Sequence, residues 1–391
     1  MDTLYNIGLS FRLAFRNIIS SGLRTWLTIT TLSLAFVMIL FFNSMYTGWE
    51  YQGIRDQVNW EFAQGQVIHP DYDKLDPFTI ESGHGNYEKD AHLTPVLIRQ
   101  ANIYPDGRMV PILLKGIPAD QQIVELPTQL LKESKVNIPA LIGLGMAQDN
   151  NLKVGDAILM RWKDKNGTFD AQNITIAGIF ETNVPTIDAG QIWIDLNRMN
   201  QLTGLQQEAT YLLADAEYNQ TTNASWNYKD KEALLKEFYE LIELKRGGSS
   251  FLYGILMLIA LIAIFDSQVF SVFKRQKEIG TYIALGFTKK RVTFLFTLEG
   301  TMYAFIATVV GSIIAIPLLS WLHEVGIPMT SNVDQSRKMG ITVGEYIYPL
   351  MTPELFTKTV FWVVVLSAVI SYLPVRKIAK MNTVDALKGK K

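Results

Sequence analysis

Cysteine is absent from the 391-residue sequence, and histidine is scarce. The lack of thiols excludes a disulfide framework, a thiolate nucleophile and a cysteine-ligated metal site. Two of the four histidines, His84 and His92, are eight residues apart, which is not a spacing typical of metal ligands. We therefore expect no metal site. The 36 basic and 37 acidic residues nearly cancel, so a nucleic-acid partner is not expected.

Sequence motifs of common enzymes are missing as well. There is no G-x-S-x-G and no H-E-x-x-H, so neither a serine hydrolase nor a zinc peptidase is indicated. The phosphate-binding motif G-x-x-x-x-G-K-[ST] is also absent, which means that the chain does not bind ATP through such a loop. The sequence thus predicts no catalytic residue and no bound cofactor, and we expect the protein not to be an enzyme.

Long apolar runs are what the sequence does contain. Hydrophobic residues make up 48% of the chain and are concentrated in a few blocks. About 20 helical residues, each rising ~1.5 Å, cross the ~30 Å hydrocarbon core of a bilayer. The blocks therefore predict an α-helical membrane domain with four transmembrane helices, at residues 25–47, 248–273, 292–322 and 355–374.

Basic residues indicate on which side of the membrane each connection lies. The loop 274–291 and the tail 375–391 are rich in lysine and arginine, so both are expected in the cytosol. Residues 1–24 have apolar residues at helical spacing. We interpret them as an amphipathic helix on the cytosolic face or, alternatively, as a longer start to the first span. Residues 48–247 and the loop 323–354 are then extracytoplasmic.

The segment 48–247 is long enough to form a domain of its own. Its pattern is typical of an α+β fold, and Asn166-Gly167 is a hairpin turn signal between two of its strands. We expect helices at 140–151 and 195–202, and strands at 67–69, 96–103, 110–116, 157–162, 172–180 and 191–194.

Residues 231–246 predict one more helix, with its leucines, a phenylalanine and an isoleucine on one face. Gly247 and Gly248 follow it directly, ahead of the second span. Two interpretations stay open. The helix is either a stalk that joins the outer domain to the membrane or an element that packs within the outer domain.

The cytosolic loop contains a short helical pattern of its own, EIGTYIALG. Its spacing would place Ile279, Ile283 and Leu285 on one face, and Gly286 would cap the C-terminal end. A short amphipathic helix held between two spans is suited to docking another protein and pushing on the membrane.

Two acids interrupt the apolar runs beside this loop. Asp266 lies eight residues before Lys274, and Glu299 lies eight residues after Arg291. Both would then sit at matching depth, ~12 Å inside the membrane boundary. A charge there costs about 2.5–3.5 kcal/mol. One interpretation is a polar contact between spans that senses loop movement. The alternatives are that both side chains reach back to the cytosolic cations or that one is protonated. Small residues at helical spacing predict close helix approach in the third span, at Gly300, Ala304, Ala307, Gly311 and Ala315.

The segment KRQKEIGTYIALGFTKKRVTFLFTLEG resembles the signature of the FtsX-like permease domain in the MacB, LolC and LolE group of ABC transporters. The start of the chain and its tail, LPVRKIAKMNTVDALKG, resemble the family as well. Three positions depart from the pattern, because Asp266 replaces the usual Asn, Lys274 an acid and Thr383 a proline. The residues that fall on the signature are Arg275, Glu278, Ile279, Gly280, Ala284, Leu285, Gly286 and Glu299.

This resemblance implies a mechanism. Permeases of the group act as dimers of two copies or of two paralogues, over two ATPase subunits that bind the ATP. The loop 274–291 would be the coupling loop that receives their movement, with Glu278 facing the ATPase. The outer segment would be a MacB-like periplasmic core that handles cargo, in a bacterial inner membrane with both termini in the cytosol.

Within the group, the layout and length are closest to the LolC and LolE permeases, and GIPAD at 116–120 is similar to a G-I-x-P-E element of theirs. The resemblance therefore favours the release of lipoproteins from the inner membrane. Two alternatives remain open. One is a MacB-like efflux permease with a separate ATPase. The other is an FtsX-like regulator of cell-wall hydrolases.

Overall fold

The computed structural model describes residues 23–220, 223, 225–329 and 344–379. The amphipathic helix expected at 1–24 lies outside these residues except for its last two positions, as does most of the basic tail. The chain divides into two compact units. We call them the membrane unit (Met1–Trp49, Glu243–Ile327 and Tyr348–Lys391) and the α+β unit (Glu50–Ile242 and Pro328–Ile347).

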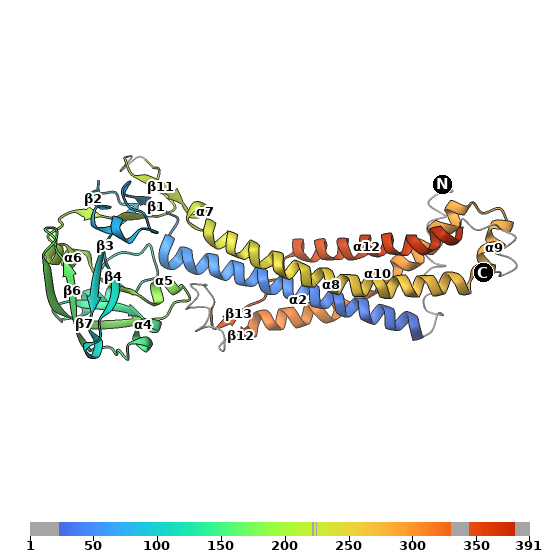
Figure 1. The fold of residues 1–391 in the computed structure, drawn as a ribbon, viewed down its shortest axis with the longest axis horizontal. Helices are drawn as coiled ribbons and strands as arrows, with labels where there is room; N and C mark the ends of the chain where they lie inside the picture. Colours follow the sequence, from blue (N-terminus) through green and yellow to red (C-terminus); the bar gives the residue numbers. More distant parts are fainter. Residues whose placement is uncertain (1–22, 221–222, 224, 330–343, 380–391) are drawn as a thin grey trace. The chain divides into compact units, whose positions relative to one another are not determined.

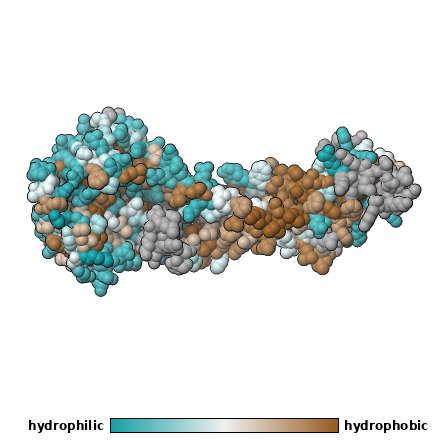
Figure 2. All heavy atoms as spheres, in the orientation of Figure 1, coloured by the Kyte–Doolittle hydropathy of each residue, from teal (hydrophilic) through white to brown (hydrophobic). Residues whose placement is uncertain are grey.

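Four long helices form most of the membrane unit (Figure 1): α2 (Leu23–Gln57), α8 (Lys236–Lys274), α10 (Lys289–Val325) and α12 (Pro353–Ala379). Each is long and apolar enough to cross a membrane. Many of their apolar side chains are exposed, and Figure 2 shows them gathered over these helices. Exposed apolar surface of this extent is what a bilayer covers. The prediction of a multi-pass membrane protein with four spans is confirmed.

The second span is longer than its apolar run. The sequence predicted a helix that ends before Gly247, but only the short α7 (Lys231–Leu234) is separate, and α8 runs without a break through both glycines. A glycine weakens a helix by only about 1 kcal/mol. Directly after the glycines, the Ser249 hydroxyl lies 2.6 Å from the Tyr46 hydroxyl of α2 and 3.1 Å from the Lys245 carbonyl, which holds this turn of α8.

The start of α8 packs within the α+β unit. Phe238 is buried, and its ring occupies the space that a side chain at position 53 of α2 would need, so Gly53 permits this contact. Leu235 and Ile242 are buried as well. Two interpretations of residues 231–246 were open, a stalk or an element that packs within the outer domain. The contacts of Leu235, Phe238 and Ile242 agree with packing within this unit.

Small residues bring α10 close to its neighbours, as predicted. Gly300, Ala304, Ala307, Gly311 and Ala315 are all buried. A Cβ atom at Gly311 would lie 2.6 Å from the Phe36 ring of α2, and one at Gly300 would overlap Ser371 of α12. The spacing of small residues therefore determined where these helices meet.

A nine-stranded sheet organises the α+β unit, in the order β11-β1-β10-β3-β4-β8-β5-β7-β6. The last strand also pairs with β3, so six strands from β3 to β6 close into a barrel. The pairs β4–β8 and β5–β7 are parallel, and the other pairs in the sheet are antiparallel. The strands are β1 (Gly65–Ile68), β3 (Leu93–Ile103), β4 (Val110–Ile117), β5 (Pro139–Gly143), β6 (Ala157–Lys163), β7 (Phe169–Phe180), β8 (Gln191–Asp195), β10 (Tyr211–Ala214) and β11 (Asn227–Asp230).

Alternating apolar residues fill this barrel. Successive side chains of a strand point to opposite faces, so every second residue of each strand enters the interior. Trp162, which is 1% exposed, is among the largest side chains there, and its indole N–H donates to the Leu202 carbonyl at 2.9 Å. The α+β fold class is thus confirmed. The barrel interior contains Leu97, Ala101, Ile103, Ile112, Leu114, Ala140, Ile142, Ile158, Met160, Ile174, Ile176, Ile192 and Ile194.

All six predicted strands are present, but the helix predicted at 140–151 is wrong in its first third. Residues up to Gly143 form β5, and α4 covers only Leu144–Asp149. The apolar run PALIG is buried between β7 and β8, and periodicity alone does not separate such a strand from a buried helix. The Asn166-Gly167 turn joins β6 to β7 as expected, with Gly167 at φ +80°. The other short elements are η1 (Val58–Phe62), η2 (Pro77–Glu81), β2 (Gly85–Asn86), η3 (Pro105–Gly107), α3 (Gln129–Glu133), α5 (Pro185–Asp188), α6 (Leu196–Thr203), β9 (Glu208–Ala209), β12 (Ile327–Pro328) and β13 (Tyr346–Ile347).

Candidate functional site

The predicted loop helix is present as α9 (Gln276–Ala284), directly after α8. The two helices are separated by Arg275 alone, whose φ of −102° and ψ of 20° depart from helical values. This break lets the chain change direction at the end of the second span. It also places the Arg275 side chain at the junction of three helices.

Arg275 joins α9 to the third span. Its Nε donates to Glu278 at 2.7 Å, one turn further along α9. Its Nη1 donates to both carboxylate oxygens of Glu299 in α10, at 2.8 and 3.1 Å. The guanidinium also lies 4.8 Å from the centre of the Phe296 ring. One side chain therefore connects the loop helix, the end of α8 and the interior of α10.

Burial raises the free-energy cost of breaking this ion pair. The Glu299 side chain is 4% exposed and the Arg275 side chain 18%. A buried carboxylate is tolerated when it is paired and hydrogen-bonded, and removing one partner of such a pair costs about 3–5 kcal/mol. Movement of α9 relative to α10 would separate these charges, so the pair holds the two helices together.

An apolar contact supports the same attachment. Ile279 is 2% exposed and packs in a cluster with Val272 of α8, Val292 and Phe296 of α10, and Val375 of α12. Ile283 packs against this cluster from the same face of α9, as predicted. Leu285, in contrast, is 72% exposed, which corrects the prediction that it shares this face. The helix ends at Ala284, so helical spacing no longer applies at the next residue.

Gly286 ends the loop helix, and its φ of +95° is a conformation that favours glycine. The Phe287 N–H donates to the Tyr282 carbonyl at 3.0 Å, and the Gly286 N–H donates to the Ile283 carbonyl at 3.1 Å. This pattern is a Schellman motif, which satisfies the last carbonyls of a helix. The prediction of a glycine cap describes this geometry well.

One face of the loop is left open. Glu278 lies on it, with its side chain 54% exposed although bound to Arg275. Gly280 is buried on the opposite side of α9. Leu285 and Phe287 add exposed apolar area beside several lysines. The open face consists of Lys277, Glu278, Thr281, Ala284, Leu285, Phe287, Lys289 and Lys290.

Asp266 is not part of this arrangement. The sequence suggested that Asp266 and Glu299 are equivalent, but Asp266 is exposed on α8 whereas Glu299 is buried. Within the described part of the chain, the Asp266 side chain has no hydrogen bond or ion pair. Its neighbours Ser267 and Gln268 are the residues that α8 turns inward. The two acids therefore do not form one polar contact.

Gln268 and Ser371 are polar residues of the membrane unit that sequence reasoning missed. Both are at most 1% exposed, and both lie against Gly300, the residue after Glu299. Polar residues inside an apolar run were the available signal, but only the structure brings these two positions together. They show where α8, α10 and α12 meet beside the ion pair.

Residues 250–383 match the family model described as the FtsX-like permease C-terminal domain. This part of the chain is therefore similar to the C-terminal domain of FtsX-like permeases. The match contains all of α9, α10 and α12, and therefore every residue of the site described above. The resemblance to FtsX-like permeases that the sequence motifs indicated is thus found again over residues 250–383.

Two further comparisons add little to the FtsX-like assignment. The crystal structure of the extracellular domain of the noncanonic ABC-type transporter YknZ from Gram-positive bacteria is similar at 11% identity and a TM-score of 0.25. The alignment covers 45% of this chain and 94% of that domain. A likeness at this level carries no functional argument. No curated protein matches the chain.

Proposed function

We propose that this FtsX-like permease is the membrane subunit of an ABC-type transporter, driven by an ATPase that is held on a partner chain. The observation that carries the proposal is the Arg275–Glu299 ion pair. It attaches the loop helix α9 to the interior of α10. A partner that binds the open face of α9 and displaces this helix would therefore displace a membrane span as well.

Force then passes through contacts inside the membrane unit. The Ile279 cluster joins α9 to α8, α10 and α12 on the apolar side. Close approach at Gly300 lets α10 carry α12 with it, because well-packed helices shift as units. The ATPase would bind the face that contains Glu278 and Leu285.

The side of the membrane and the oligomer are part of the same proposal. The loop 274–291 is basic, which favours the cytosol for the loop and for both termini. The α+β unit is then extracytoplasmic, in a bacterial inner membrane. A second permease chain, either another copy or a paralogue, completes the transporter.

For the cargo, we propose a lipoprotein that is released from the membrane. The support is the layout of four spans with a large α+β unit between the first two, which resembles LolC and LolE. The similarity of GIPAD adds little, because Gly116 is explained by packing, since a Cβ there would lie 2.7 Å from Met199 of α6. Efflux and hydrolase regulation remain the rival functions.

Purification of the full chain in a gentle detergent, followed by mass spectrometry of its partners, tests both levels of the proposal. A small ATPase with acylated lipoproteins is the expected result. A membrane-fusion protein would favour efflux instead, and a cell-wall hydrolase would favour regulation. Recovery without any ATPase would overturn the proposal.

A pair of variants tests the docking face directly. We expect Leu285→Glu to reduce recovery of the ATPase at least tenfold, because it places a charge in an apolar part of the interface. Val154→Glu is the matched control, since Val154 is an exposed apolar residue of the α+β unit. Equal recovery with both variants would remove this face of the loop from the interface.

A further inference from the structure

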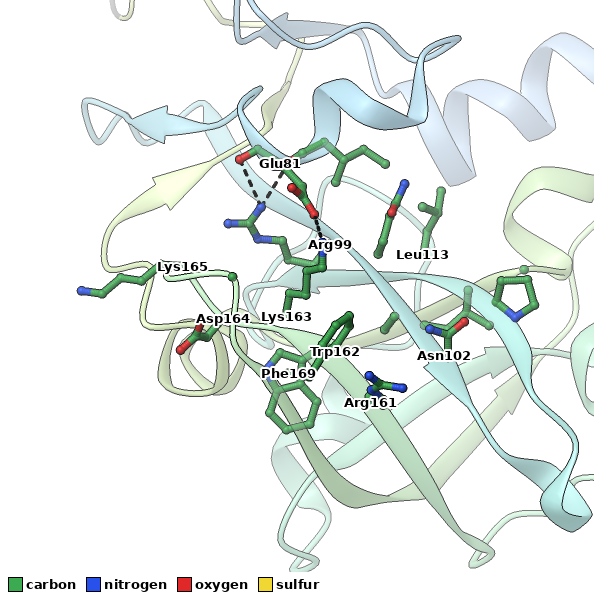
Figure 3. A pocket seen from close by; sticks show the side chains of 17 residues that line it. Glu81, Arg99, Asn102, Leu113, Arg161, Trp162, Lys163, Asp164, Lys165 and Phe169 are labelled. Carbon is green, nitrogen blue, oxygen red and sulfur yellow. Dashed lines mark hydrogen bonds and ion pairs between the residues drawn. The ribbon is translucent and has the colours of Figure 1, made fainter.

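The outer surface of the barrel contains a polar cavity that the permease mechanism does not use. Its volume is about 540 Å³. Strands β3, β4 and β6 form its floor, and η2 lies above it (Figure 3). Gln100 and Asn102 of β3, Pro111 and Leu113 of β4, and Arg161 and Lys163 of β6 line it. Along the strands these positions alternate with Arg99, Ala101, Ile112 and Trp162, which line the cavity as well, so residues from both faces of the strands contribute to it.

Positive charge is concentrated around this cavity. Four cations line it, against the two carboxylates of Glu81 and Asp164. The cations come from three different parts of the chain: Arg99 from β3, Arg161 and Lys163 from β6, and Lys165 from the turn after β6.

Arg99 is the most informative of these cations, because it is only 7% exposed. Its guanidinium donates to the Ile80 carbonyl at 3.2 Å and bonds the His84 imidazole at 3.0 Å. Neither partner is a carboxylate. Its Nε has no hydrogen-bond partner among the described residues. Glu208, which pairs with His84 at 2.6 Å, and Glu81 attract the Arg99 charge without bonding the guanidinium directly. An anion in the cavity would give this buried cation a direct partner.

The other cations are held by weak partners. Lys163 forms an ion pair with Glu81 at 2.8 Å, but the two side chains are 43% and 59% exposed, and such pairs contribute little. The Arg161 guanidinium lies 3.9 Å from the centre of the Phe169 ring, which orients it without neutralising it. Figure 3 shows Glu81 above Lys163, where an entering anion would take its place.

We propose that this cavity binds the phosphate group of a phosphate ester. The two oxygens of a carboxylate lie in one plane and are satisfied by a single guanidinium. A tetrahedral phosphate presents oxygens in several directions, which suits cations that arrive from β3, β6 and the turn after β6. Leu113 and Phe169 supply apolar surface for the body of the ester. The ester is either a soluble compound or the head group of a phospholipid.

Calorimetric titration of the full chain in detergent with glycerol phosphate and with glycerate tests this assignment. We expect saturable binding of glycerol phosphate, at least tenfold tighter than that of glycerate. Arg161→Gln should weaken it about tenfold, the usual loss for one charge-assisted hydrogen bond. Glu81→Gln should strengthen it, because the competing carboxylate is gone. This gain cannot arise from misfolding.

Lys153→Gln is the matched control, since Lys153 is an exposed lysine of the same unit outside the cavity. Micelles doped with phosphatidic acid or with phosphatidylcholine identify the source of the ester. Competition by phosphatidic acid alone, lost in Arg161→Gln, would support a lipid head group, and its failure to compete would support a soluble ester. No saturable binding, equal binding of glycerate, or binding unchanged by Arg161→Gln would overturn the proposal. None of these results depends on ATPase coupling.

Discussion

Each of the two units contains a buried carboxylate, Glu299 in one and Glu61 in the other, and the two are held in different ways. In the membrane unit, both oxygens of Glu299 accept from one Arg275 nitrogen. In the α+β unit, Glu61 of η1 accepts from the Lys74 ammonium at 3.1 Å and from the Thr186 hydroxyl at 2.9 Å. Lys115 lies nearby, over the Trp193 ring at 4.8 Å. The first arrangement is a pair and the second is a cluster.

Charge in the cluster is balanced among several groups. Burial raises the pKa of Glu61, but Lys74 and Lys115 attract its charge and two hydrogen bonds stabilise it, so the pKa ends below its ordinary value. Burial lowers the pKa of Lys115 to about 8, against the attraction of Glu61. Lys115 can therefore lose its charge while Glu61 keeps its own.

The difference between a single ion pair and a cluster fits the position of each carboxylate in the fold. A planar guanidinium fixes direction as well as distance, whereas an ammonium is a point charge on a flexible stem. The pair joins two helices that we propose to move together. The cluster joins η1, the continuation of α2, to Lys74 ahead of η2 and to Thr186 of α5, so more than one contact holds η1.

The largest effect is expected for Arg275→Met, which leaves Glu299 buried without this partner. The loss should be about 3–5 kcal/mol, visible as a lower unfolding midpoint of the detergent-solubilised chain in fluorescence-detected size exclusion. The double variant Arg275→Met with Glu299→Gln should recover most of the stability but not ATPase-coupled activity. An unchanged midpoint for Arg275→Met alone would show that the pair is dispensable.

A smaller effect is expected for Glu61→Gln. The amide keeps an oxygen acceptor but loses the charge-assisted bonds, which are worth about 1.5–3 kcal/mol. Hydrogen–deuterium exchange of the full chain should speed up in η1 and β4. Glu133→Gln, at an exposed site in the same unit, is the control and should not change exchange. Equal exchange in both variants would mean that the cluster does not stabilise the α+β unit.

The cluster should also respond to pH through Lys115. Its folded pKa of about 8 lies below the ordinary value of 10.5, so between these values the unfolded chain binds more protons. Stability therefore rises with pH above 8, by at most about 1.4 kcal/mol per pH unit. Exchange of β4 amides between pH 8 and 9.5 should show this rise relative to Lys115→Met. The exposed Lys132→Met should keep it, and parallel profiles for wild type and Lys115→Met would contradict the assignment.

The smallest effect is expected for Asp266→Asn. Because Asp266 is exposed on α8 and has no ion pair in the described chain, its replacement breaks no contact, and the unfolding midpoint should not fall. ATPase-coupled activity should stay within twofold. A loss as large as that of Arg275→Met would disprove the distinction drawn between the two intramembrane acids.

Much of the secondary structure and topology of the chain was predictable because it follows from local sequence patterns. Apolar runs of about 20 residues indicated the spans, and small residues indicated the close faces of α10. Glu299 stood out as a charge inside such a run. Its partner did not, because Arg275 is 24 residues away and lies among several other cations. Nothing local selects one of them.

Other parts depended on contacts that no local pattern describes. The run 140–143 became a strand because β7 and β8 flank it. The residues of the phosphate-ester cavity come together only because β3 pairs with both β4 and β6. Lys115 and Glu61 are ordinary charged residues in the sequence, and their burial follows from the sheet that covers them.

By itself, then, the sequence determined the four spans, the α+β class of the unit between them and the loop helix with its glycine end. These follow from hydrophobic periodicity and backbone preference, which act over a few residues. Only the tertiary structure decided that Glu299 is paired while Asp266 is exposed, that the barrel closes, and that four cations surround one cavity. These depend on which distant residues meet, and packing over the whole chain selects that.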